Sequence, residues 1–218
     1  MKILFISLGC DKNLADSEEM LGLLTGNGHE IVDSEEEADA IVINTCCFIH
    51  DAKEESVNTI LEMAEYKKTG TCKILIVTGC MAQRYKEEIT EEIPEVDAVL
   101  GTTSYGDIVK ALNEAEAGHV FREFKDINAL PEDSGRRVIT TGGHFGYLKI
   151  AEGCDKHCTY CIIPSLRGKF RSVPEERLLK QAEYMASQGV RELILVAQET
   201  TVYGTDLYGK KTLHILLK

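Results

Sequence analysis

Short apolar runs alternate with longer stretches of helical periodicity along the first half of the chain. The apolar runs are rich in β-branched residues, as strands buried on both faces are. Between them, apolar residues recur every three or four positions, which is typical of amphipathic helices. This alternation favours an α/β fold with a doubly wound, mostly parallel sheet. We predict strands at 2–10, 38–46, 73–80 and 96–103, and helices at 13–28, 51–68, 83–93 and 106–115.

The pattern changes near the middle of the chain, where residues 122–144 collect Pro, Gly, Asp and Arg without periodicity. Beyond them come a strand, a cysteine-rich loop, a helix at about 174–188, a strand at 191–198 and a further helix from about Thr212. A complete α/β barrel typically takes about 250 residues, so we expect only the start of such a barrel here. The predicted division is an N-terminal α/β domain (1–121), a linker (122–144) and an incomplete second domain (145–218).

Charge and composition narrow the functional classes. The 218 residues carry a formal net charge of -12, which disfavours direct binding to DNA because that needs a basic face. The apolar run near the N-terminus is too short for a signal peptide, and no stretch is long enough to span a membrane. We therefore expect a cytoplasmic protein without membrane contact. Eight cysteines in a reducing compartment indicate metal or redox chemistry before disulfides.

Three cysteines, Cys10, Cys46 and Cys80, each close a predicted strand. The carboxyl ends of parallel strands lie on one edge of a sheet, where ligands collect, so these three residues are expected to meet in space. A single cysteine at such a place is often an inert core residue, but three at equivalent places favour a shared ligand. Cys47 and Cys72 fall outside this pattern, and we expect the first to pack in the core and the second to lie at the surface.

A second set of cysteines, Cys154, Cys158 and Cys161, forms a C-x3-C-x2-C run. A structural zinc ion needs a fourth ligand, and although His157 lies inside the loop, no second ligand pair follows at the usual spacing. A 4Fe-4S cluster is the alternative, since three cysteines would leave one iron open to an exogenous ligand. The spacing favours the cluster over zinc.

The motifs around these cysteines resemble the radical S-adenosylmethionine methylthiotransferases, and within that family the RimO type, which modifies an aspartate of a small-subunit ribosomal protein. The resemblance covers the whole chain. It implies a transferase with two 4Fe-4S clusters, one held by Cys10, Cys46 and Cys80 and the other, which binds S-adenosylmethionine, by Cys154, Cys158 and Cys161. The segments that carry it are SLGCDKNLADSE (7–18), NTCCFIHDAKEES (44–56), EGCDKHCTYCIIPSLRGKFRS (152–172) and AQETTVYGTDLYG (197–209).

Further site residues follow in part from the resemblance and in part from side-chain chemistry. The resemblance places Tyr160 near the adenine of the cofactor. Gln198 closes the second barrel strand, where barrel enzymes carry functional groups. Arg167 and Arg171 have guanidinium groups suited to the carboxylate of the cofactor or of the substrate, although a solvated basic face would explain them equally well. We assign no catalytic side chain, because the resemblance leaves the chemistry to the clusters.

Two other functions share part of these features. A tRNA methylthiotransferase of the MiaB type, acting on isopentenyladenosine, would hold the same clusters. A non-catalytic iron-sulfur protein for electron transfer or scaffolding would suit a short chain, but it would need four protein ligands for each cluster. The resemblance also implies a flavodoxin or ferredoxin as electron donor, and further barrel strands and a TRAM domain beyond Lys218. We therefore expect little or no turnover from these residues alone.

Overall fold

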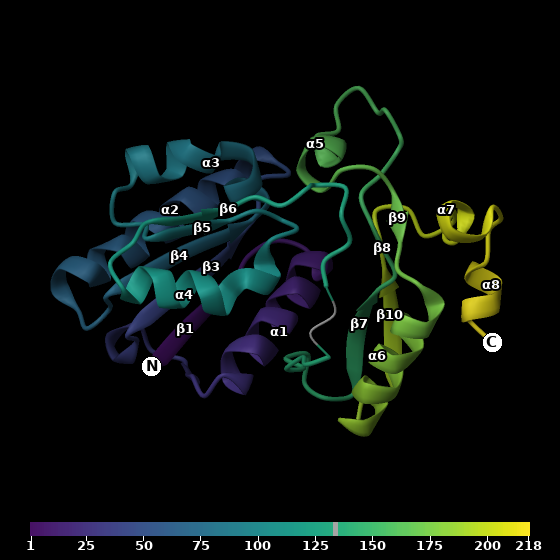
Figure 1. The fold of residues 1–218 in the computed structure, drawn as a ribbon, viewed down its shortest axis with the longest axis horizontal. Helices are drawn as coiled ribbons and strands as arrows, with labels where there is room; N and C mark the ends of the chain where they lie inside the picture. The colour runs from purple at the N-terminus through teal and green to yellow at the C-terminus, as the bar shows by residue number, and fades with distance from the viewer. Residues whose placement is uncertain (133–134) are drawn as a thin grey trace.

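A six-stranded parallel sheet forms the first half of the chain in the computed structural model, which describes residues 1–132 and 135–218 (Figure 1). Its strand order is β2-β1-β3-β4-β5-β6, so the order reverses between β1 and β3. All neighbouring pairs are parallel, which confirms the predicted doubly wound fold. The strands are β1 (Lys2–Ser7), β2 (Glu30–Val32), β3 (Ala40–Thr45), β4 (Ile74–Gly79), β5 (Ala98–Leu100) and β6 (Phe121–Glu123).

Helices cover both faces of this sheet. On one face, α1 (Asp11–Gly26) and α4 (Ile108–Glu116) pack over a core that includes Met20, Leu24 and Leu112. On the other, α2 (His50–Thr69) and α3 (Cys80–Glu92) pack over a core that includes Ile60 and Ile89. Two single 3-10 turns, η1 (Glu35–Glu37) and η2 (Tyr105–Asp107), complete the connections.

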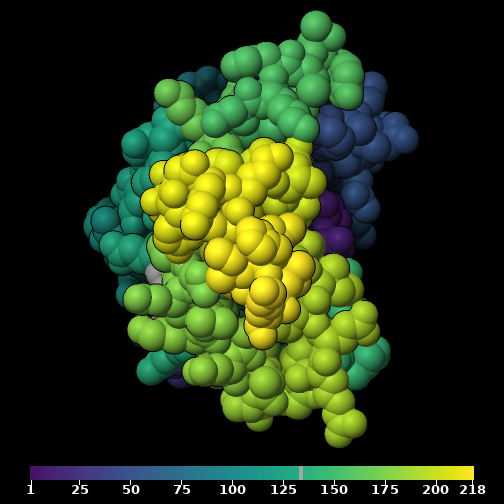
Figure 2. All heavy atoms as spheres, turned by 90° about the vertical axis from the view of Figure 1, so that its right-hand side faces the viewer, coloured from purple at the N-terminus to yellow at the C-terminus, as the bar shows by residue number. Residues whose placement is uncertain are grey.

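The second half of the chain builds a smaller α/β unit beside the first (Figure 1). Its strands β7 (Phe145–Lys149) and β10 (Glu192–Val196) are parallel neighbours, and α6 (Glu175–Ser187) packs on them around Leu178 and Met185. Figure 2 shows the C-terminal residues, in yellow, on the outer surface of this unit. The other elements are β8 (Ala151–Glu152), which pairs with β9 (Arg171–Ser172), and the short helices α5 (Ile163–Arg167), α7 (Thr205–Tyr208) and α8 (Leu213–Leu216).

Two edge strands of the large sheet have no counterpart in the predicted pattern. Both β2 and β6 are three residues long, too short to show an alternation of apolar and polar positions. The strand β6 also occupies the first residues of the segment predicted as a linker, of which residues 133 and 134 lie outside the described part of the chain. None of the helices in residues 1–132 and 135–218 is long and apolar enough to cross a membrane.

Helix α1 is the element that joins the two halves, because it contacts β7 as well as the large sheet. Most of its residues are buried, including charged ones such as Asp16, Glu18 and Glu19. Buried charges need partners, and those of α1 come largely from residues beyond position 136. The two halves therefore share a polar interface.

Candidate functional site

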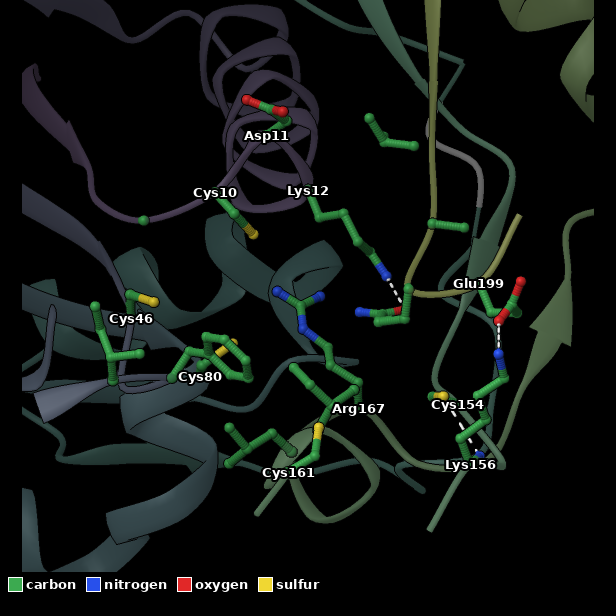
Figure 3. Close-up of a pocket in the computed structure, with 18 of the residues that line it drawn as sticks. Cys10, Asp11, Lys12, Cys46, Cys80, Cys154, Lys156, Cys161, Arg167 and Glu199 are labelled. Carbon is green, nitrogen blue, oxygen red and sulfur yellow. Dashed lines mark hydrogen bonds and ion pairs between the residues drawn. The ribbon is translucent and has the colours of Figure 1, made fainter. Parts of the chain in front are cut away.

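A pocket of about 760 Å³ lies between the carboxyl edge of the large sheet and the loop that carries the C-x3-C-x2-C run (Figure 3). It is next to the point where the strand order reverses, which is where open α/β sheets bind ligands. All six cysteines of the two predicted sets line it: Cys10, Cys46, Cys80, Cys154, Cys158 and Cys161. The structure thus brings both predicted sets to one cavity.

The three N-terminal cysteines follow the ends of β1, β3 and β4. Cys10 is exposed and caps the start of α1, Cys46 directly follows β3, and Cys80 opens α3. Gly9 has a φ of 93°, and a Cβ on it would lie 2.8 Å from the Cβ of Cys46. A glycine is therefore what allows the loop of Cys10 to approach Cys46 so closely.

Asn13 connects the loops that carry these three cysteines, and it is fully buried. Its side-chain amide donates to the carbonyl of Leu8, at 3.1 Å, and to that of Thr45, at 2.9 Å. The Sγ atom of Cys80 lies 3.9 Å from the Oδ1 atom of Asn13. One side chain in the first turn of α1 thus fixes the spacing of all three loops.

The C-x3-C-x2-C loop is more open. Cys158 is exposed and Cys154 and Cys161 are half-buried, so these sulfur atoms are accessible to a bound group. The loop is anchored at its start, where the backbone N-H of Cys154 donates to the carbonyl of Gly168 at 3.1 Å. Lys156 forms an ion pair with Glu199, which follows β10 (Figure 3). The loop is therefore held at Cys154 by Gly168 and at Lys156 by Glu199.

Gly153, the residue before Cys154, permits this anchor, and we expect Gly153→Ala to destabilise the chain. Its φ is +71°, and a Cβ would lie 2.0 Å from the carbonyl oxygen of Lys169. Strained φ alone costs about 1 to 3 kcal/mol, and the backbone clash adds to that. Gly142→Ala is the matched control, because its φ is +76° but a Cβ there would meet nothing within 4 Å. Urea unfolding of both variants measures the difference, and equal losses would contradict the predicted clash.

Buried charges from both halves of the chain meet behind the pocket. The ammonium group of Lys12 lies 3.0 Å from Glu152, and the guanidinium group of Arg167 lies 2.8 Å from Asp16. Lys149 pairs with both carboxylates. These five side chains are at most 8% exposed. We call this group the interface network; it ties α1 to β7, β8 and α5.

The electrostatics of the site follow from this burial. Burial lowers the pKa of Lys12 to about 8, although Glu152 acts in the opposite direction. Burial likewise raises the pKa of the Cys80 thiol, while the neighbouring Arg167 guanidinium opposes that rise. Buried charges are tolerated only when they are paired, and removing one partner typically costs about 3 to 5 kcal/mol. Each charge of the interface network therefore depends on the others for its stability in the folded chain.

The interface network was not predicted from the sequence, although one signal of it was present there. Lys149 and Glu152 interrupt an otherwise apolar strand segment, and charges at such positions require buried partners. Lys12 and Asp16 are spaced by one helical turn on α1, so they present charge to the same side. The pairing itself joins residues more than 130 positions apart.

The four residues predicted to contact the cofactor do not all lie in the pocket. Tyr160, which is 88% exposed, and Gln198 line the pocket, and the Oε1 atom of Gln198 accepts from Lys12 Nζ at 2.5 Å. Arg167 also lines the pocket but is held by protein carboxylates. Arg171 is not part of the described lining, and its Nη1 donates to the carbonyl of Arg167 at 3.1 Å.

The two remaining cysteines are both buried. Cys47 is 2% exposed in the core under α2 and α3, as its position predicts. Burial raises its pKa to about 11, which makes it a poor thiolate. The expectation that Cys72 lies at the surface is wrong: it is 3% exposed and its Sγ donates to the carbonyl of Ile74 at 3.3 Å. Periodicity and position suggested the surface, but the side chain is already buried two residues before β4 begins.

The donor set fits a group larger than one ion. Within residues 1–132 and 135–218, no three Cys, His, Asp or Glu side chains converge as the ligands of a single metal ion would. An iron-sulfur cluster has several irons, so its ligand sulfurs stand further apart than those around one ion. Soft sulfur donors from separate loops, around a cavity with apolar side chains such as Phe48 and Leu166, match that requirement.

Comparison with known proteins gives matches for both halves. Residues 2–101 match the uncharacterized protein family UPF0004, and residues 148–217 match the radical SAM superfamily. Over its full length the chain is 66% identical to a protein of Lachnoclostridium phytofermentans and 51% identical to one of Clostridioides difficile. Both carry the name ribosomal protein uS12 methylthiotransferase RimO. The alignments cover 50% and 49% of those proteins, so the chain spans about half their length.

Proposed function

Because this chain belongs to the RimO type of radical S-adenosylmethionine methylthiotransferase, we propose that it supplies the two-cluster centre of such an enzyme. Cys10, Cys46 and Cys80 would hold one 4Fe-4S cluster, and the cysteines of the C-x3-C-x2-C loop would hold the other. The observation that supports this most is that both three-cysteine sets line the same pocket. A substrate activated at one cluster could accept a sulfur held at the other only if both clusters faced the same cavity.

The side chains of the pocket have roles consistent with this function. When bound, the clusters would supply the electron that cleaves S-adenosylmethionine and a site for the sulfur that is transferred. Tyr160 would lie against the adenine, and Gln198 would contact the cofactor from the end of β10. Apolar residues at the mouth, such as Phe48 and Ile49, would limit the access of water to a reactive intermediate. Lys12 orients Gln198 through its hydrogen bond.

The substrate and partners belong to the same proposal. The names of the relatives favour ribosomal protein uS12 over a tRNA as the substrate. The family resemblance implies that the methylthio group would be added to the β-carbon of an aspartate of that protein. An electron donor such as flavodoxin or ferredoxin would reduce the C-x3-C-x2-C cluster in the cytoplasm. These 218 residues match about half of the relatives, and we propose that they bind the cofactor but have little or no turnover alone.

The response to S-adenosylmethionine tests the proposal. We expect the cofactor to shift the electron paramagnetic resonance spectrum of the reduced, reconstituted chain, because an iron with only three cysteine ligands is open to it. The variant C10A/C46A/C80A should retain this shift, while C154A/C158A/C161A should lose it. An unchanged spectrum in the unsubstituted chain would instead indicate clusters with four protein ligands, as in an electron carrier.

A further inference from the structure

We propose that Arg167 acts in the N-terminal three-cysteine site, where its positive charge raises the reduction potential of the cluster bound by Cys10, Cys46 and Cys80. This inference rests on the proposed function, which assigns a cluster to those residues. Arg167 itself follows the C-x3-C-x2-C loop, on α5. The second half of the chain would thus tune a cluster that is held by the first half.

The direction of the side chain supports this assignment. In Figure 3 the guanidinium group of Arg167 extends away from Cys161 and toward the space between Cys10 and Cys80. Its Nη2 donates to the Oδ1 atom of Asn13 at 2.5 Å, the same atom that lies 3.9 Å from the Sγ of Cys80. Arg167 therefore contacts the residue that spaces the three N-terminal loops.

The charged groups around Arg167 carry a net positive charge. Arg167 is paired with Asp16 and Glu152, but these carboxylates are also paired with Lys149, and Glu152 with Lys12. Three cations thus face two carboxylates in the interface network. Glu19, a further buried acid of α1, accepts a hydrogen bond from Tyr105, and burial raises its pKa.

A buried positive charge has a predictable effect on a cluster. Three thiolates and the cluster sulfides form an anionic group, and reduction adds one more negative charge. A guanidinium group in a medium of low dielectric constant stabilises the reduced form more than the oxidised form. Arg167 is 3% exposed, so solvent screens this interaction little. Its pairing with Asp16 and Glu152 reduces the field at the cluster. The guanidinium group nevertheless acts on the Cys80 thiol, both through its charge and through a hydrogen bond.

Potentiometric titration of the N-terminal cluster alone tests the inference. The background variant is C154A/C158A/C161A, so that only one cluster contributes to the electron paramagnetic resonance signal. Added to it, Arg167→Gln should shift the midpoint potential to a more negative value, and Arg167→Lys should restore most of the shift because it keeps the charge. Arg191→Gln is the matched control and should leave the potential unchanged, since that side chain is exposed before β10 and does not line the pocket.

The outcomes separate this inference from the proposed function. A background variant that binds no iron would remove the N-terminal cluster and would overturn both. A cluster that assembles with the same potential in the Arg167→Gln and unsubstituted backgrounds would overturn only the role of Arg167. Thermal unfolding of each variant is followed in parallel. If the midpoint potential falls by the same amount in the Gln and Lys variants, the arginine acts through structure and not through charge, which also overturns the inference.

Discussion

Replacing Cys46 with alanine is expected to remove about half of the iron that the chain binds after anaerobic reconstitution. Two 4Fe-4S clusters correspond to about eight irons, and loss of one thiolate from a site that has only three should prevent the N-terminal cluster from assembling. Cys46 cannot easily be replaced as a ligand, because hydrogen bonds between its backbone and the Ser56 hydroxyl, at 3.0 and 2.8 Å, fix its position. The measurement is the iron and sulfide content per chain.

Cys72→Ala is the matched control for this experiment. Cys72 is as buried as Cys46 but lies in the core at the entry to β4 and does not line the pocket. Its replacement should leave about eight irons bound. If Cys46→Ala also leaves about eight, the N-terminal set is not a cluster site, whereas about four in the unsubstituted chain would show that only one of the two sets binds.

Replacing Glu18 with glutamine should lower the free energy of unfolding by about 3 to 5 kcal/mol, the usual cost of leaving a buried charge without its partner. Glu18 is fully buried on α1. It accepts from Nε of Arg137 at 2.7 Å, and from the backbone N-H and hydroxyl of Thr140 at 2.7 and 2.8 Å. Glutamine keeps the size of the side chain, but its amide nitrogen cannot accept a hydrogen bond, so the change removes one acceptor together with the charge. Urea denaturation at neutral pH measures the loss.

Glu62→Gln gives the comparison, because it removes the same charge from an exposed position on α2. An exposed charge far from other features changes stability by at most about 0.5 kcal/mol. A loss at Glu18 no larger than that at Glu62 would mean that Arg137 finds solvent or another partner once the carboxylate is gone.

The sequence allowed the site to be located because its main elements are regular. The strands that end near Cys10, Cys46 and Cys80 have strong apolar patterns, and parallel strands bring their carboxyl ends together by necessity. The C-x3-C-x2-C spacing is a local property of the chain and needs no tertiary information. The assignment of ligands to both sets stays a prediction, to which the structure adds the shared pocket.

Contacts between distant segments could not be predicted in the same way. The hydrogen bond of Lys12 to Glu152 joins residues 140 positions apart, and periodicity carries no information at that range. Strand β1 also ends at Ser7 and not at Cys10, because Gly9 turns the backbone before the helix begins. Apolar pattern alone does not reveal that a glycine at this place has a positive φ.

The buried charges of α1 have a further consequence, for how the chain folds. Asp16 and Glu18 receive their hydrogen bonds from residues beyond position 136, while the apolar side of the same helix packs on the large sheet. If α1 packs on the first sheet before the second unit docks, those carboxylates are buried without hydrogen-bond partners. The two halves should therefore fold and unfold in a single cooperative transition, and a cut between them would yield two fragments that are each less stable than the whole.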